Sequence, residues 1–166
     1  MRCDKYRISK LADISKVPGP ARDILLKAAH LRDEYKKLEK EFSKLEELSE
    51  TFNISKETMD SARSRLKETI EELNYTLNLL RIMGYFDGIG TNGFLYLFRI
   101  KQYVLCFYDR AEGFVLDIEI LKDTPTDPKE RIYVGRFVMP TEDFFTLILR
   151  LGEKIRNGEA DELLNC

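Results

Sequence analysis

The sequence predicts an α+β protein in which a long antiparallel helical hairpin precedes a four-stranded antiparallel sheet and a C-terminal helix. Two patterns support this prediction. Between residues 21 and 83, apolar residues recur at spacings of three and four, which is typical of amphipathic helices. From residue 94 onward, short runs rich in β-branched and aromatic residues alternate with polar residues, as strands with one buried face do.

These patterns divide the chain into three parts. Residues 1–20 form an N-terminal polar segment, residues 21–83 the helical hairpin with a heptad seam, and residues 84–166 the sheet with its closing helix and an acidic tail. The first part ends in Val17-Pro18-Gly19-Pro20, which interrupts regular structure and favours the start of a helix. We therefore expect the first long helix to begin there.

The hairpin is predicted from two apolar series separated by a break at residues 51–55. Asn53 or Ser55 can cap the second helix. Such a hairpin can close on itself, dock on the sheet, or pair with another hairpin in a dimer, and its narrow seam has room for one such partner. The seam residues are Ile24, Ala28, Leu31, Tyr35, Leu38, Phe42, Leu45 and, after Ser49, Phe52, then Met59, Ala62, Leu66, Ile70, Leu73, Leu77, Leu80 and Met83.

Four strands are predicted at Phe94–Lys101, Tyr103–Arg110, Phe114–Leu121 and Arg131–Met139. Their alternation places large apolar side chains on one face, which the closing helix is expected to cover. That helix begins at Pro140-Thr141, and Thr141 is the expected N-cap.

Composition and charge restrict the classes of protein. With 43% hydrophobic and 34% charged residues, the chain has enough apolar surface for a core. The 27 basic and 29 acidic residues give a net charge of −2, whereas nucleic-acid-binding domains are usually basic. Gln102 is the single glutamine beside many Lys, Arg and Glu residues, a bias found in thermophiles.

The N-terminal residues and the cysteines indicate the cytoplasm. The start of the chain never develops the apolar run of a signal peptide, and no membrane span is predicted. The cysteines, at positions 3, 106 and 166, are far apart and odd in number, which favours free thiols over disulfides or a zinc site.

No pattern in the sequence predicts catalysis, a cofactor or a metal. Gly88-Ile-Gly90-Thr-Asn-Gly93 matches the dinucleotide-binding fingerprint, but it leaves a helix and enters a strand, the reverse of what pyrophosphate binding needs. His30 has no partner at a useful spacing. Asp117 and Glu119 point to the same face, where they pair with neighbouring arginines or, alternatively, act as a catalytic carboxylate pair. We expect a non-enzymatic protein.

The second sheet face carries the one constellation with a clear mechanism. Tyrosine rings can stack on the bases of a single strand while arginine and lysine contact its phosphates. Alternatively, this face is solvated, or the helical hairpin packs on it. The predicted nucleic-acid-binding residues are Arg99, Lys101, Tyr108, Arg110, Arg131 and Tyr133.

Two short motifs carry a resemblance to known families. Val115-Leu-Asp-Ile-Glu119 and Phe137-Val-Met-Pro-Thr-Glu-Asp-Phe144 resemble the third strand and the helix start of β4α single-strand-binding domains of the transcriptional coactivator and whirly-like class. Glu119 stands where those proteins tend to carry Arg. The order of two long helices, sheet and helix also resembles the archaeal ThermoDBP-related single-stranded DNA-binding proteins, which oligomerise. Both resemblances imply single-strand binding.

The sequence therefore predicts an oligomeric protein, a dimer or a tetramer, that binds single-stranded nucleic acid, with DNA preferred to RNA, on a sheet face or cleft. The alternative is a coiled-coil adaptor whose small α/β domain recognises another protein. The first hypothesis requires binding that weakens with salt. The second requires a salt-tolerant protein contact through the exposed part of the heptad seam.

Overall fold

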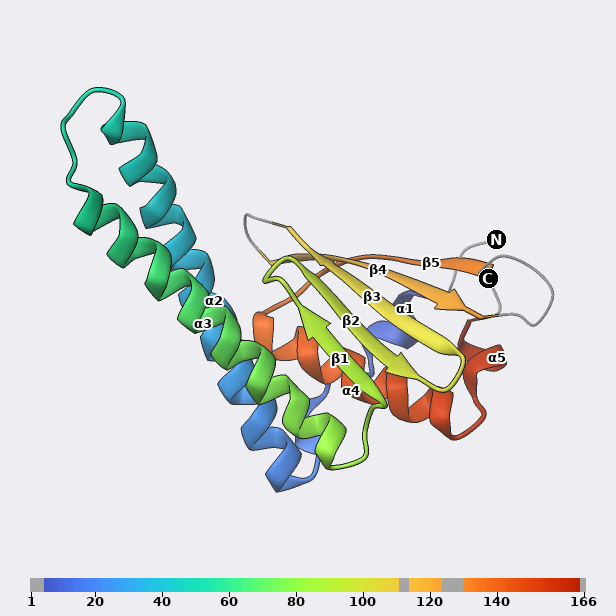
Figure 1. Ribbon diagram of the computed structural model, residues 1–166. Helices are drawn as coiled ribbons and strands as arrows, with labels where there is room; N and C mark the ends of the chain where they lie inside the picture. Colours follow the sequence, from blue (N-terminus) through green and yellow to red (C-terminus); the bar gives the residue numbers. More distant parts are fainter. Residues whose placement is uncertain (1–4, 111–113, 124–129, 165–166) are drawn as a thin grey trace.

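A computed structural model describes residues 5–110, 114–123 and 130–164 of the chain. It confirms the predicted α+β class, since two long helices precede an antiparallel sheet and another helix follows it (Figure 1). The sheet has five strands in the order β1-β2-β3-β4-β5, not the predicted four. Each strand therefore pairs with its neighbours along the chain.

The additional strand is β1, Gly88–Thr91, which pairs antiparallel with β2, Leu95–Ile100. The sequence predicts no strand here, because glycine disfavours strands. The turn that follows requires a glycine at Gly93, whose φ is +97°. An added Cβ there would lie 2.6 Å from side-chain atoms of both Tyr35 and Ile70, so this turn sits directly against the hairpin.

The remaining strands match the predicted runs closely. They are β3, Tyr103–Asp109, β4, Val115–Lys122, and β5, Glu130–Val138. A bulge interrupts the last pairing, because Ile118 lies opposite Gly135 while Glu119 lies opposite Tyr133, which leaves Val134 as the extra residue. The bulge reverses the direction in which the following side chains of β5 point.

The hairpin consists of α2, Gly19–Ser49, and α3, Lys56–Ile82. Ser55 caps α3 by accepting a hydrogen bond from the backbone N–H of Thr58 at 3.2 Å. The basal half of the hairpin docks on the rest of the protein, with α3 against β1 and α2 against α4, Thr141–Arg156. The distal half projects beyond the sheet, where the two helices pack on each other alone (Figure 1).

The core lies between the sheet and α4. Tyr96 meets Phe145 edge to face with ring centroids 5.5 Å apart, and Phe98 stacks at an angle on Phe107 at 5.6 Å. Three short elements complete this layer: α1, Lys5–Ser9, the 3₁₀ turn η1, Ile14–Lys16, and α5, Ala160–Leu163. The polar N-terminal segment thus contributes to the core, and its buried residues are Ile8, Leu11 and Val17.

A buried ion pair joins the hairpin to this layer. Asp109, at the end of β3, is 5% exposed and accepts two hydrogen bonds from Arg32 of α2, at 2.6 and 2.7 Å. Arg32, 3% exposed, also donates to Thr141 at 3.0 Å, and Thr141 donates to Asp33 at 2.7 Å. The hydroxyl of Thr141 therefore serves a tertiary contact, and the prediction that it caps α4 is wrong.

The helices of the described segments include none that combines the length and the apolar character required to cross a bilayer.

Asp109→Ala tests the buried ion pair. We expect it to lower the free energy of unfolding by about 3–5 kcal/mol, because it leaves the guanidinium of Arg32 buried without its main partner. The double variant Asp109→Leu/Arg32→Met should be less destabilised than the single variant, since it removes both charges. Denaturant unfolding followed by circular dichroism measures both.

Asp60→Ala provides the matched control, because it removes an exposed ion pair with Arg63, and such pairs contribute about 0–1 kcal/mol. An equal loss of stability in Asp109→Ala and in this control would contradict the role given to Asp109.

Candidate nucleic-acid interface

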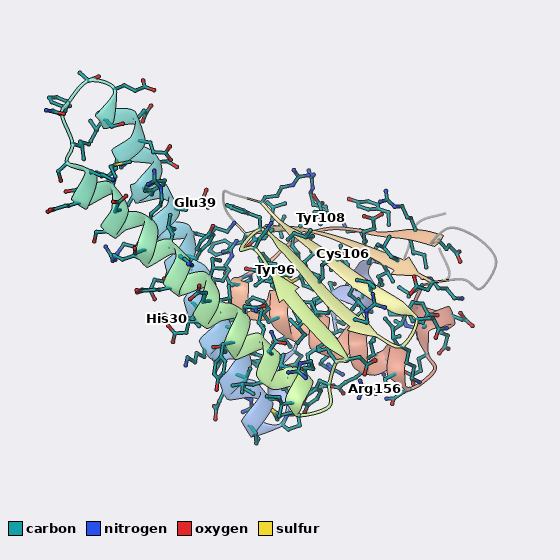
Figure 2. All side chains as sticks on the ribbon, viewed as in Figure 1. His30, Glu39, Tyr96, Cys106, Tyr108 and Arg156 are labelled. Atoms are coloured by element: carbon teal, nitrogen blue, oxygen red, sulfur yellow. The ribbon has the colours of Figure 1, made fainter. Side chains whose placement is uncertain are left out.

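The sheet face opposite α4 is open. The helices α1, α4 and α5 lie on the core side, and the hairpin runs along the β1 edge (Figure 1). Among the described residues, no helix lies over β3, β4 and β5 on the other side, which we call the outer face. Tyr108 is 40% exposed and Tyr133 61% exposed there, and Figure 2 shows Tyr108 standing off the sheet. The hairpin therefore does not cover the predicted site.

Asp117 of β4 organises one half of the outer face. Its carboxylate accepts hydrogen bonds from Arg110 at 2.9 Å, from Arg136 at 2.9 Å and from the hydroxyl of Tyr133 at 3.4 Å. The hydrogen bonds from Arg136 and then from Arg110 hold the pKa of Asp117 below its ordinary value. Asp117 is buried, but both arginine side chains are more than half exposed.

Glu119, two residues further along β4, organises the other half. Its carboxylate accepts a hydrogen bond from the hydroxyl of Tyr108 at 3.2 Å and lies 3.5 Å from Nε of Arg131. Burial, together with the negative charge of Glu119, raises the pKa of Tyr108, so that the phenol stays protonated and donates. Val104 and Cys106 form a buried apolar floor beneath these groups. The two carboxylates thus hold tyrosines and arginines in fixed positions.

The outer face brings together five of the six predicted residues: Arg99, Tyr108, Arg110, Arg131 and Tyr133. Arg99 lies toward one end, 3.7 Å from Asp123. Lys101 was placed wrongly, because it lies in the turn after β2 with a φ of +54°, and its amine donates to the carbonyl of Arg156 at the end of α4. The left-handed backbone conformation at Lys101 ends the alternation of side chains along β2, and the predicted position of Lys101 depended on that alternation.

Arg136, which is not among the predicted site residues, is turned toward the outer face by the bulge in β5. A strand of unbroken alternation would place residues 131, 133, 135 and 137 on one face, whereas beyond the bulge Arg136 lies opposite Asp117. The available signal was Gly135, because an isolated glycine inside a strand pattern often marks a bulge.

The chemistry of the outer face favours an anionic, aromatic ligand over catalysis. Four arginines face three carboxylates, so the local charge is slightly positive although the chain carries −2. The lowered pKa of Asp117 is unfavourable to general-acid catalysis near neutral pH. Within the described ranges, no group of three or more His, Cys, Asp or Glu residues is arranged to hold a metal ion.

Comparisons with known proteins gave no significant match. Family models, curated proteins and solved structures were each compared with the chain, and none matched. The resemblance to whirly-like domains therefore rests on the two motifs quoted for it, and the resemblance to ThermoDBP-related proteins rests on the order of the helices and the sheet. The function of the outer face is inferred from its own geometry.

Asp117→Asn tests the charge network through its pH dependence. At pH 7 we expect it to lower the free energy of unfolding by about 1–2 kcal/mol, because the charge that it removes holds two half-exposed arginines. The folded-state pKa of Asp117 is lowered, so its stabilisation is full above the unfolded pKa of about 3.9 and disappears as pH falls through the folded pKa. Denaturant unfolding across this pH range measures the difference.

The variant and the natural protein should therefore converge in stability at acid pH. Asp60→Asn, in an exposed ion pair of the hairpin, should change stability little at any pH. A difference for Asp117→Asn that persists unchanged below the folded pKa would contradict an ionic role.

Proposed function

We propose that this chain is a non-enzymatic cytoplasmic protein that binds single-stranded nucleic acid, DNA in preference to RNA, on its outer sheet face. The main support is the open face itself, on which exposed tyrosine rings lie among four arginines. Stacking of a base on an aromatic ring contributes roughly 1–3 kcal/mol and requires no particular base. Arginines beside the rings contact the phosphates.

The two tyrosines lie on either side of β4. Tyr108 is opposite Asp117 in the register with β3, and Tyr133 is opposite Glu119 in the register with β5. With strands about 4.8 Å apart, the two rings are on the order of 10 Å from each other. That separation suits the bases of an extended single strand, whereas a duplex keeps its bases stacked inside and offers no ring face.

The carboxylates hold the arginine side chains in position but do not occupy all of their hydrogen-bond donors. A guanidinium has five N–H groups, and one hydrogen-bonded carboxylate uses only part of them. Arg131, whose side chain is 74% exposed, retains donors for a phosphate while Glu119 holds its stem in place. Asp117 and Glu119 also repel the phosphates, which limits affinity, and the contacts between arginine and phosphate make binding sensitive to salt.

Fluorescence anisotropy of labelled single-stranded and duplex oligonucleotides at several salt concentrations tests the proposal. We expect the single strand to bind more tightly than the duplex. Tyr133→Ala should weaken binding about 5- to 150-fold, the equivalent of one stacked base. Arg131→Ala/Arg136→Ala should weaken it and reduce the slope of log affinity against log salt by about 0.7 for each phosphate that the variant no longer binds.

Lys16→Ala/Lys27→Ala is the matched control, because it removes the same charge from exposed positions away from the outer face. Glu119→Gln should strengthen binding by removing a repulsive charge. Equal losses of affinity in the arginine variant and the lysine control would place the site elsewhere. Failure to bind any oligonucleotide at low salt would overturn the proposal in favour of a protein-recognition role.

A further inference from the structure

The distal hairpin, residues 36–67, leaves its apolar seam incompletely covered. Between Leu38 and Thr69 every residue is at least partly exposed. Leu48 is 47% exposed and Phe52 62% exposed, a large apolar exposure for the tip of a projecting hairpin. The apolar residues of the distal hairpin are Leu38, Phe42, Leu45, Leu48, Phe52, Ile54, Met59, Ala62 and Leu66.

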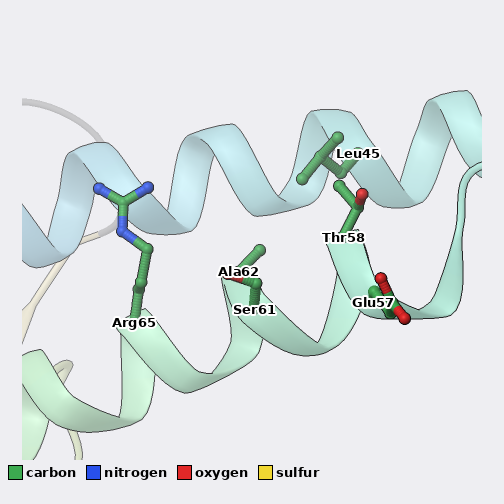
Figure 3. A pocket seen from close by; sticks show the side chains of 6 residues that line it. All are labelled: Leu45, Glu57, Thr58, Ser61, Ala62 and Arg65. Carbon is green, nitrogen blue, oxygen red and sulfur yellow. The ribbon is translucent and has the colours of Figure 1, made fainter.

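A groove opens along this seam between Leu45 of α2 and residues 57–65 of α3. It has a volume of about 380 Å³ and lies between the two helices, as Figure 3 shows. Small side chains make the groove, because Ser61 and Ala62 of α3 face Leu45 of α2 and leave room between the helices. The other residues that line it are Glu57, Thr58 and Arg65. The groove can receive apolar side chains of a partner helix.

The charges of the distal hairpin are segregated along its length. Residues 46–60, the acidic tip, contain five acidic residues and one lysine, for a net charge of −4. Residues 36–45 and 61–67, the basic collar, contain seven basic and two acidic residues, for a net charge of +5. Tip and collar are adjacent, and these side chains are exposed except for Glu39 and Lys36, which are partly buried; Lys36 lies 3.5 Å from Asp109.

The groove lies where the acidic tip meets the basic collar, since Leu45 and Ser61, which line it, are the collar residues at that boundary. A two-fold axis through this boundary places the acidic tip of one hairpin on the basic collar of a second copy. It also places the acidic tip of the second copy on the basic collar of the first. Opposite charges then meet at both ends, and the half-covered seams face each other around the axis. Such isologous pairing is the commonest form of homodimer.

We propose that two copies of this chain pair through their distal hairpins, antiparallel and around a two-fold axis, to form a four-helix bundle with each acidic tip against the partner's basic collar. The overlap of about ten residues in each helix is roughly 15 Å long. In this dimer the hairpin seams are buried, and both outer sheet faces remain outside the bundle. The inference does not depend on nucleic-acid binding.

Charge reversal with sedimentation analysis tests the pairing. The natural chain should sediment as a dimer of 19.5 kDa subunits at low salt. A tip variant, Glu46→Lys/Glu50→Lys/Glu57→Lys, and a collar variant, Lys40→Glu/Lys44→Glu/Arg63→Glu, should each become monomeric, because tip and collar then carry the same sign. Mixed together, the two variants should form a heterodimer, since both tip–collar contacts regain opposite charges.

Asp23→Lys/Asp161→Lys is a control that changes exposed charges outside the hairpin's distal half, and it should remain dimeric. Circular dichroism verifies that each variant is folded. The proposal is overturned if the natural chain is monomeric at low salt, if folded tip and collar variants remain dimeric, or if they fail to associate when mixed.

Discussion

The buried ion pair between Arg32 and Asp109 is the contact on which the arrangement of the whole molecule depends. Two buried charges are costly unless they are paired and fully hydrogen-bonded, and here both oxygens of Asp109 accept from one guanidinium. Because Thr141 joins the same network, α2 is fixed at once to the end of β3 and to the start of α4. This geometry holds the hairpin at the β1 edge, and the outer face stays open as a consequence.

Carboxylate and guanidinium groups also pair on the outer face, but there the pairing has a different role. Asp117 binds two arginines as Asp109 binds one, but the arginines of Asp117 are more than half exposed, whereas Arg32 is buried. In the core, the ion pair fixes the relative positions of secondary-structure elements. On the surface, the carboxylate orients guanidinium groups that still reach solvent, which makes them suitable for contacts with phosphate.

The periodic parts of the fold were predictable and the irregular parts were not. Apolar spacing located the hairpin, the strands after the first and the closing helix, because burial imposes a period on long elements. Strand β1, Gly88–Thr91, and the orientation of Arg136 were missed because glycines and a bulge interrupt the alternation. Lys101 and Thr141 were misassigned because a left-handed turn and a tertiary contact override local rules. Nothing local distinguishes Arg32 from an exposed helix residue, since its partner is 77 positions away.

Photo-crosslinking tests the central claim most directly. A single-stranded oligonucleotide carrying halogenated uracils is bound to the natural chain, irradiated and digested, and the crosslinked peptides are identified by mass spectrometry. Stacking on the outer face predicts crosslinks at Tyr108 or Tyr133, because a stacked ring lies in van der Waals contact with the base. Crosslinks confined to the hairpin or to the N-terminal segment would contradict the assignment of the outer face as the binding site.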